Sequence, residues 1–222
     1  EEYAWNTSWG VSTRLIGGLV MTHGDDKGLI VPPRLAPTQV IIVPILKGEN
    51  SSLVLEKTKE VESRLKAAGV RVKIDARDNV SPGVKYYEWE RKGVPYRMEI
   101  GPKDIEKGSV ALARRVVLDG DKRKSFVLED QAVAEMPNLL EEFQTELRDA
   151  SVARREENTV RGVNTVNELQ EALDGGAGFV FTGWNGDPSV EEEVKSLTKA
   201  TIRCLPSEEF RSPQTPVKCV SG

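Results

Sequence analysis

Five side chains suited to recognising an unpaired nucleic-acid base fall within residues 75–104. They are Tyr86, Glu90, Arg97, Lys103 and Asp104. Single-stranded bases stack on aromatic rings and guanidinium planes, and carboxylate and ammonium groups complement the hydrogen-bonding edges of the bases. The alternative is structural: Tyr86 packs a helix against a sheet, and the charged residues form surface ion pairs that contribute little stability. We assign Trp89 to such packing.

A short helix and the strand after it must position these side chains. Ser81 followed by Pro82 predicts the start of the helix, and Gly93 predicts its end. Tyr86 and Glu90 are four residues apart, so a helix places them on one face. Arg97 falls on the next strand, and Lys103 and Asp104 fall in the loop after that strand. If the helix packs on the sheet in the ordinary way, all five meet at one edge.

The charge of the chain is distributed unevenly, which bears on the partners it could bind. The net charge of −4 argues against indiscriminate nucleic-acid binding. Residues 64–124, however, hold 16 Lys and Arg against 9 Asp and Glu, whereas the rest of the chain holds 15 against 26. This basic segment is either a solvated charged face or part of a nucleic-acid surface. No apolar run is long enough for a membrane helix, and two cysteines fit a reducing cytoplasm.

Alternating strands and helices predict an α/β fold whose first domain has a mixed, largely parallel sheet with flanking helices. The expected strands cover residues 40–45, 70–74, 96–100 and 109–117. One expected helix covers residues 51–68, and the other lies between Pro82 and Gly93. The predicted buried stripe of the first helix is Val54, Val61, Leu65 and Ala68. A turn with a basic tip, residues 119–124, follows the last strand.

The C-terminal part of the chain predicts a second, small α/β domain. A long amphipathic helix is expected over residues 137–158. Thr165 and Glu168 form a capping box at the start of another helix. The remaining expected elements are a strand at residues 179–181, a helix that begins at Asp187 and Pro188, and a strand at residues 201–205.

An arginine at a strand–helix junction characterises the beginning of the chain. Residues 5–14 alternate in the manner of a strand, and residues 15–21 repeat apolar side chains at helical spacing. Arg14 lies at the junction. It is either a surface or salt-bridge residue, or a phosphate ligand. Residues 22–37 are rich in Gly and Pro and predict an irregular linker. His23 is the single histidine, which excludes any mechanism that needs two.

A close resemblance to a known family begins in residues 3–37, YAWNTSWGVSTRLIGGLVMTHGDDKGLIVPPRLAP. This segment resembles the third class-defining motif and the following linker of prolyl-tRNA synthetases of the archaeal and eukaryote-like type. The resemblance implies that Arg14 is catalytic and contacts the ATP phosphates. It also implies that Trp9, Gly10 and Ser12 line the pocket for ATP and prolyl-adenylate. A fixed guanidinium suits that role because negative charge builds on the phosphate oxygens when the proline carboxylate attacks.

The family's first two motifs, with its metal-binding carboxylates and most of its proline pocket, lie upstream of this segment. The chain begins with Glu1, and we expect it to be a fragment that does not activate proline by itself. The resemblance implies a full-length ligase that couples proline to tRNA(Pro) with ATP and Mg²⁺. It further implies a cytoplasmic enzyme that forms a homodimer.

The resemblance continues through QVIIVPI, KYYEWERKGVP and EIGPKD into the family's anticodon-binding domain. It implies that the five residues named at the outset contact the anticodon, which for proline ends in two guanines. Glu90 with Lys103 complements the edge of one guanine. Asp104 with Lys122 or Lys124 complements the other, while the aromatic and guanidinium side chains stack on bases.

The sequence VEEEVKSLTKATIRCLP, near the end of the chain, resembles the family's C-terminal zinc-binding module. A structural zinc needs about four nitrogen or sulfur ligands. The family's four ligand positions fall at Asn185, at Val190, at Cys219 and near Gly222, and Cys204 matches a cysteine that does not ligate. We therefore expect no zinc. The side chains expected to pack the module instead are Phe179, Phe181, Trp184 and Val194.

The resemblance divides the chain into three parts. Residues 1–37 are expected to be the end of a class II catalytic domain with its linker, and residues 38–135 an anticodon-binding α/β domain. Residues 136–222 are expected to be a bridging helix and a C-terminal α/β domain. The alternative is a non-catalytic RNA-binding accessory protein with an anticodon-domain fold. A small-molecule-binding α/β domain is a weaker reading because no glycine-rich phosphate loop follows any strand.

Overall fold

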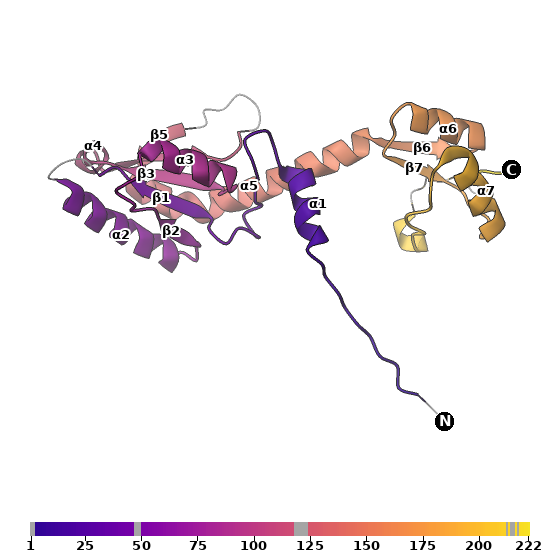
Figure 1. The fold of residues 1–222 in the computed structure, drawn as a ribbon, viewed down its shortest axis with the longest axis horizontal. Coiled ribbons are helices and arrows are strands. Elements are labelled where there is room, and N and C mark those ends of the chain that lie inside the picture. The colour runs from indigo at the N-terminus through magenta and orange to yellow at the C-terminus, as the bar shows by residue number, and fades with distance from the viewer. Residues whose placement is uncertain (1–2, 47–49, 118–123, 212, 214–215, 217) are drawn as a thin grey trace. The chain divides into compact units, whose positions relative to one another are not determined.

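The chain divides into two compact units, Glu1–Arg148 and Asp149–Gly222. A computed structural model describes residues 3–46, 50–117, 124–211, 213, 216 and 218–222 (Figure 1). Among these described residues, no helix is long and apolar enough to cross a membrane. Each unit has its own sheet and its own buried cluster.

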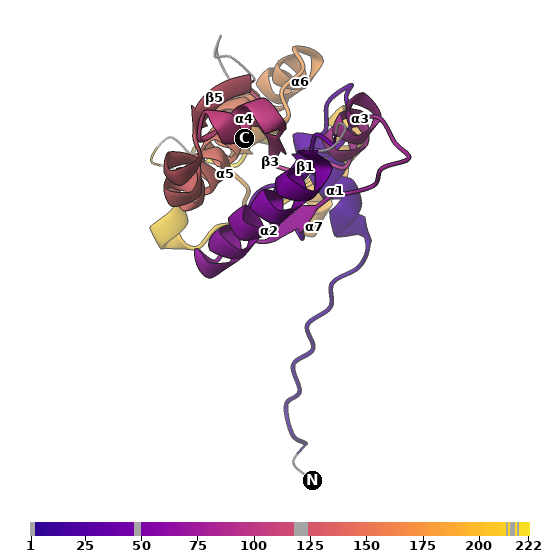
Figure 2. The same cartoon turned by 90° about the vertical axis from the view of Figure 1, so that its left-hand side faces the viewer.

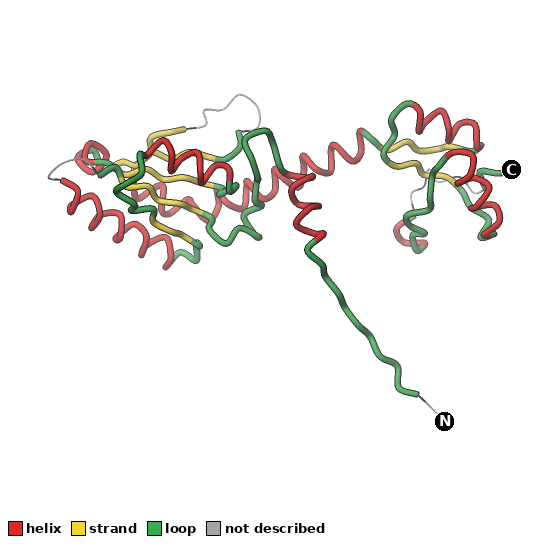
Figure 3. Tube along the Cα trace, viewed as in Figure 1, coloured by secondary structure: helices red, strands yellow, loops and turns green. Residues whose placement is uncertain are grey.

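The first unit contains a five-stranded mixed sheet, which confirms the predicted α/β fold (Figure 3). Its strands are β1 (Val40–Pro44), β2 (Val72–Ile74), β3 (Tyr96–Ile100), β4 (Ser109–Arg114) and β5 (Lys124–Leu128). In the order β2-β1-β3-β4-β5, β1 is parallel to β2 and β3, whereas β4 is antiparallel to β3 and β5. The parallel pairing is thus confined to three strands, and β5 was missed from the sequence.

Helices cover the two faces of this sheet unequally. All five residues of β1 are buried, as the apolar sequence of this strand predicts. Helices α2 (Ser51–Ala67) and α5 (Glu129–Glu157) contribute to the main core with Ile42 and Met98. Helix α3 (Pro82–Arg91) lies on the other face, near β1 and β3 (Figures 1 and 2).

The predicted buried stripe of α2 is correct at three of its four positions. Val54, Val61 and Leu65 are fully buried. Ala68 is exposed because the helix ends at Ala67, so the chain has left the helical path at that position. The fourth buried residue of α2 is Thr58, whose hydroxyl donates a hydrogen bond to the Val54 carbonyl at 2.7 Å.

Helix α5 begins at Glu129, well before Pro137, where the sequence predicted its start. Proline lacks the amide hydrogen for one main-chain bond and is poorly suited to a helix interior. The helix nevertheless continues through it, because Met136 and Leu140 on either side are both buried in the core. Similarly, the expected loop after β3 contains a short helix, α4 (Pro102–Glu106).

The first residues of the chain do not form the expected strand. Residues 3–12 have no regular secondary structure, and Trp5 and Trp9 are almost wholly exposed. A strand requires a neighbour to satisfy its main-chain groups, and the described residues provide none for this segment. The predicted helix after it is confirmed as α1 (Arg14–His23).

The segment before β1 is irregular, as predicted, but two arginines fix it to the first unit. Arg115 is buried and donates to both Asp25 carboxylate oxygens, at 2.9 and 2.5 Å, and to the Leu29 carbonyl at 3.1 Å. Arg71 donates to the Pro33 and Ala36 carbonyls at 2.8 Å. These bonds make the linker part of the unit that carries the sheet.

The second unit is smaller and has a two-stranded parallel sheet. Its elements are β6 (Thr159–Val163), α6 (Val166–Asp174), β7 (Phe179–Thr182), α7 (Pro188–Thr198) and the 3-10 turn η2 (Glu208–Phe210). The predicted capping box is confirmed in part. Thr165 Oγ accepts a hydrogen bond from the Glu168 amide at 3.2 Å, whereas the Glu168 carboxylate accepts from the Asn164 amide at 2.8 Å. The strand expected at residues 201–205 is absent, and these residues are irregular.

The core of the second unit differs from the prediction. Val163, Leu169 and Val220 form its buried hydrophobic cluster, and Val194 packs against them as expected. Phe179 is 52% exposed, because it begins an edge of a two-stranded sheet that has little to cover it. Phe181 and Trp184 are half-buried outside this cluster.

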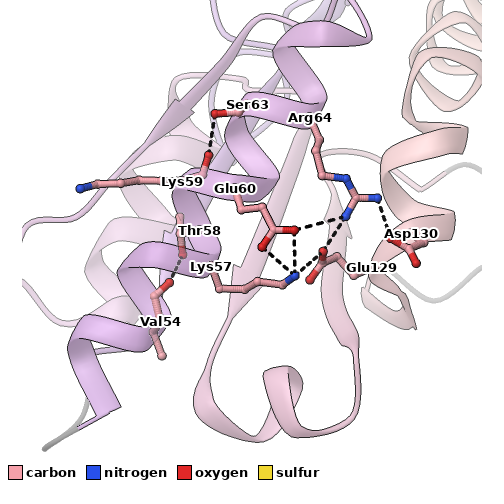
Figure 4. A network of polar contacts seen from close by, with 9 residues as sticks. All are labelled: Val54, Lys57, Thr58, Lys59, Glu60, Ser63, Arg64, Glu129 and Asp130. Carbon is pink, nitrogen blue, oxygen red and sulfur yellow. Dashed lines mark hydrogen bonds and ion pairs between the residues drawn. The ribbon is translucent and has the colours of Figure 1, made fainter.

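A network of charges joins α2 to the start of α5 (Figure 4). Glu129 is 8% exposed, and its Oε1 lies 2.9 Å from Lys57 Nζ and 2.8 Å from Arg64 Nη1. Arg64 Nη2 reaches Asp130 at 2.6 Å. The hydrogen bond to Glu129 raises the pKa of Lys57. Because α5 follows β5 directly, this network also fixes the end of that edge strand.

Replacing Glu129 with Gln is expected to lower the free energy of unfolding of the first unit by about 1–2 kcal/mol, because two cations lose a nearly buried anion. Hydrogen exchange of the β1 amides measures this. The control is Glu142→Gln, at an exposed position of α5, where we expect a change within about 0.5 kcal/mol. Equal effects of the two substitutions would contradict the prediction.

Candidate nucleic-acid interface

The half of the sheet that α3 leaves uncovered carries charged residues in register across three strands. Arg97 on β3 lies opposite Ala113 on β4, which lies opposite Lys124 on β5. In the next row on the same face, Glu99 and Ala111 are opposite one another. Cross-strand partners share a face of the sheet, so the basic and acidic side chains of β3 and β5 project toward the same side.

Tyr86 and Arg97 lie together, as the sequence predicted for a helix packed on the sheet. The Arg97 guanidinium carbon is 4.1 Å from the centroid of the Tyr86 ring. The Arg97 side chain is 17% exposed. The two groups proposed to stack on bases therefore stack on one another, a cation–π contact that fixes both.

Glu99 is the residue of this surface that the sequence interpretation missed. Its side chain is 7% exposed, and the carboxylate accepts hydrogen bonds from Arg97 Nε at 3.1 Å and from Lys124 Nζ at 2.7 Å. A signal was available, because Glu99 is two residues from Arg97 on a strand and must share its face. The burial of Glu99 was not predictable from that alternation.

Burial and neighbouring charges hold Tyr86 in its neutral form. Burial is the largest cause that raises the pKa of the Tyr86 hydroxyl, followed by its hydrogen bond to Glu99 and the negative charge of that carboxylate. The charge of Arg97 acts in the opposite direction, and that of Asp104 raises the pKa further. Asp104 thus belongs to the same electrostatic environment as Tyr86.

The other three predicted residues border this cluster on two helices. Asp104 lies in α4 and its Oδ2 accepts a hydrogen bond from the Gly101 amide at 2.9 Å, which caps that helix. Lys103 is exposed on α4, and Glu90 is half-buried one turn after Tyr86 on α3. The pairing of Glu90 with Lys103 stays a prediction.

The predicted basic turn lies largely outside the described residues. Lys122 is among the residues not described, whereas Lys124 is the first residue of β5. The Lys124 side chain is 41% exposed while it contacts Glu99. Its pairing with Asp104 stays a prediction.

Trp89, which the sequence assigned to packing of the helix against the sheet, lies outside the main core. It is half-buried outside the main cluster, and its indole N–H donates to Asp75 Oδ2 at 2.7 Å. The ammonium groups of Lys73 and Lys92 lie 5.5 and 4.5 Å from the centroid of the ring. Arg77 also binds the buried Asp75 carboxylate, and this ion pair is the largest cause that lowers the pKa of Asp75.

The four residues predicted to bind ATP and prolyl-adenylate form no pocket within the described part of the chain. Trp9, Gly10, Ser12 and Arg14 are all exposed. The Arg14 amide donates to Ser12 Oγ at 3.4 Å at the start of α1. Their role stays a prediction.

Two of the positions that the resemblance matches to zinc ligands form local hydrogen bonds. Asn185 Oδ1 accepts a hydrogen bond from the Asp187 amide at 3.0 Å. Cys219 Sγ lies 3.2 Å from Ser221 Oγ, and this hydrogen bond is the largest cause that lowers the pKa of the thiol. Cys204 is exposed on a separate segment. Among the described residues, no three His, Cys, Asp or Glu side chains gather as a metal site would require.

Known proteins resemble both units of the chain. Residues 39–143 match the family described as "Anticodon binding domain", and residues 166–222 match "Prolyl-tRNA synthetase, C-terminal". The "Proline--tRNA ligase" of Roseiflexus castenholzii is 48% identical over 220 residues, which are 99% of this chain and 44% of that protein. The chain belongs to the prolyl-tRNA synthetase family. It is similar to the C-terminal region of the archaeal and eukaryote-like type, which contains the anticodon-binding domain.

Other prolyl-tRNA synthetases are also similar to this chain, in sequence and in structure. The "Proline--tRNA ligase" of Chloroflexus aurantiacus is 49% identical over 94% of this chain and 42% of its own length. A crystal structure of the Cryptosporidium parvum prolyl-tRNA synthetase, complexed with L-proline and AMP, has a TM-score of 0.78 and 40% identity over 94% of this chain and 42% of that chain. The chain thus spans less than half the length of these relatives.

Replacing Asp75 with Asn is expected to increase hydrogen exchange of the Trp89 indole N–H about tenfold at neutral pH, because the charged acceptor and the Arg77 ion pair are lost. The folded-state pKa of Asp75 lies below its ordinary value of 3.8. Its contribution is therefore complete above about pH 4 and disappears only as the pH falls through the lowered pKa.

Exchange followed by NMR from pH 7 downward tests both points. The difference between unaltered chain and variant should stay constant to about pH 4 and then shrink. The exposed Asp78→Asn serves as control. A difference that shrinks already near pH 6 would contradict the assignment to Asp75.

Proposed function

We propose that this chain is the part of a prolyl-tRNA synthetase that binds the anticodon of tRNA(Pro). The complete protein would ligate proline to that tRNA with ATP and Mg²⁺, as a cytoplasmic homodimer. The contact residues are Tyr86, Glu90, Arg97, Lys103 and Asp104. The observation that carries the proposal is the polar cluster on the uncovered half of the sheet, within the segment that matches an anticodon-binding domain.

Guanine presents two adjacent hydrogen-bond donors and one acceptor on its Watson–Crick edge. A carboxylate accepts from the donors, and an ammonium or guanidinium group donates to the acceptor. Glu90 with Lys103, and Asp104 with Lys124, provide this combination for two guanines. The stacked pair of Tyr86 and Arg97 supplies the flat surface that an unpaired base needs.

The adenylation residues depend on parts of the enzyme beyond this chain. We propose that Trp9, Gly10, Ser12 and Arg14 line the site for ATP and prolyl-adenylate once the strand of residues 5–14 has its neighbours. Arg14 would then stabilise the charge on the α-phosphate. The chain by itself is inactive under this proposal, because these exposed residues enclose no substrate.

Residues 1–37 would then belong to the catalytic domain with its linker, and residues 38–135 to the anticodon-binding domain. Residues 136–222 would form the bridging helix and C-terminal domain. The bonds from Arg115 and Arg71 to the linker support a fixed connection at the first of these boundaries.

The decisive experiment compares binding to two anticodon stem-loops, one with the two guanines and one with adenines in their place. The unaltered chain should prefer the guanine loop, and Glu90→Ala should reduce that preference about tenfold, since one reading carboxylate is lost. Glu56→Ala, at an exposed position of α2, is the control. Equal affinity of the unaltered chain for both loops would refute the proposal.

We also expect the chain to fold without zinc, because Asn185 and Val190 replace two sulfur ligands. Elemental analysis of the purified chain should find far less than one zinc per chain. A chelator should leave hydrogen exchange of the β6 and β7 amides unchanged, whereas metal-dependent modules unfold when the metal is removed. One bound zinc per chain would overturn the prediction.

A further inference from the structure

Glu99 has no part in the anticodon contacts proposed above, yet it joins three of the elements that form the surface. Its carboxylate accepts from Arg97 Nε on β3 at 3.1 Å through Oε1 and from Lys124 Nζ on β5 at 2.7 Å through Oε2. Helix α3 is connected through Arg97, whose guanidinium carbon lies 4.1 Å from the centroid of the Tyr86 ring. An anion that is 7% exposed is thus surrounded by donors from separate segments of the chain.

The register of the sheet explains how Lys124 reaches a carboxylate two strands away. Strand β4 lies between β3 and β5, and its residues on this face are Ala111 and Ala113. Both are buried, with exposures of 2% and 3%. Their short side chains leave room for the lysine to cross β4, which a larger residue would occupy.

This arrangement places two cations at fixed positions beside the proposed base contacts. Long lysine and arginine side chains lose conformational entropy when they bind a ligand, and holding them in advance reduces that cost. The single negative charge of Glu99 offsets the repulsion between the two cations and leaves the trio with a net charge of +1. The Lys124 side chain is 41% exposed while its ammonium group contacts Glu99.

We propose that Glu99 is a positioning residue for guanine recognition, which holds Arg97 as a stacking group and Lys124 as the reading cation of the edge strand. The inference rests on the proposed function, because the ligand is the same anticodon. In this proposal Glu99 contributes to selectivity for the base. The basic segment, residues 64–124, provides the overall electrostatic attraction to RNA.

A purely structural role for Glu99 makes different predictions from a positioning role. If the carboxylate only stabilised the sheet, its loss would weaken binding to every RNA in parallel with the folded fraction. If it positions the cations, discrimination between bases falls, while attraction to the phosphate backbone persists or grows because the surface gains one positive charge.

The test uses the full 222-residue chain with Glu99→Gln and the two stem-loops that differ at the two guanines. We expect preference for the guanine loop to fall at least tenfold. Affinity for the adenine loop should stay the same or increase, with a steeper salt dependence by up to about one counterion. Glu106→Gln is the matched control, since it makes the same charge change at an exposed position of α4 and should keep the preference.

A second variant keeps the test decisive if Glu99→Gln does not fold. Lys124→Met, on an edge strand, should lose the same preference while hydrogen exchange of the β1 amides shows an intact sheet. The double variant should lose no more than Glu99→Gln alone, because that substitution already removes the contact through which Lys124 is held.

The outcomes separate this inference from the proposed function. If the unaltered chain shows no preference for guanines, the proposed function itself fails. If the unaltered chain prefers guanines and Glu99→Gln or Lys124→Met prefers them equally, the positioning role is overturned. Parallel loss of affinity for both loops in a folded Glu99→Gln variant would likewise overturn it.

Discussion

The proposed recognition surface depends on a buried carboxylate, that of Glu99, which contacts two cationic side chains. A buried carboxylate is costly to remove from water unless donors surround it, and the donors to Glu99 come from both β3 and β5. Each element must therefore hold its register for the surface to form. The network at Glu129 fixes the junction of β5 and α5, and the Tyr86 ring under Arg97 fixes α3 against β3.

The linker is a structural part of the first unit. Arg115 donates to the Glu90 carbonyl at the end of α3 as well as to Asp25 and Leu29 in the linker. Gly93, with φ of +76°, allows the two segments to approach, since a Cβ there would lie 2.4 Å from the Leu29 carbonyl oxygen. Helix α3 carries the proposed base contacts Tyr86 and Glu90. Its position therefore depends on the segment that precedes the sheet.

The two units are stabilised in different ways. The first has a large apolar core that reaches from β1 to Leu147 of α5. The second buries few of its described residues, and hydrogen bonds within its loops, such as those of Asn185 and Cys219, add local order. A small core with a weakly covered sheet explains why Phe179 stays exposed there.

The sequence by itself determined the alternation of strands and helices, the family, and the set of five candidate contact residues. All three conclusions rest on features that short stretches of chain contain: hydrophobic periodicity, helix caps such as Thr165, and sequence motifs. Only the tertiary structure decided that Glu99 joins Arg97 to Lys124. The same holds for the hydrogen bond from Trp89 to Asp75 and for β5 as the edge strand of the sheet. Glu99 and Lys124 are 25 residues apart, and their contact depends on strand order and on two alanines between them. Local patterns carry no information on such order, because it follows from how whole elements pack.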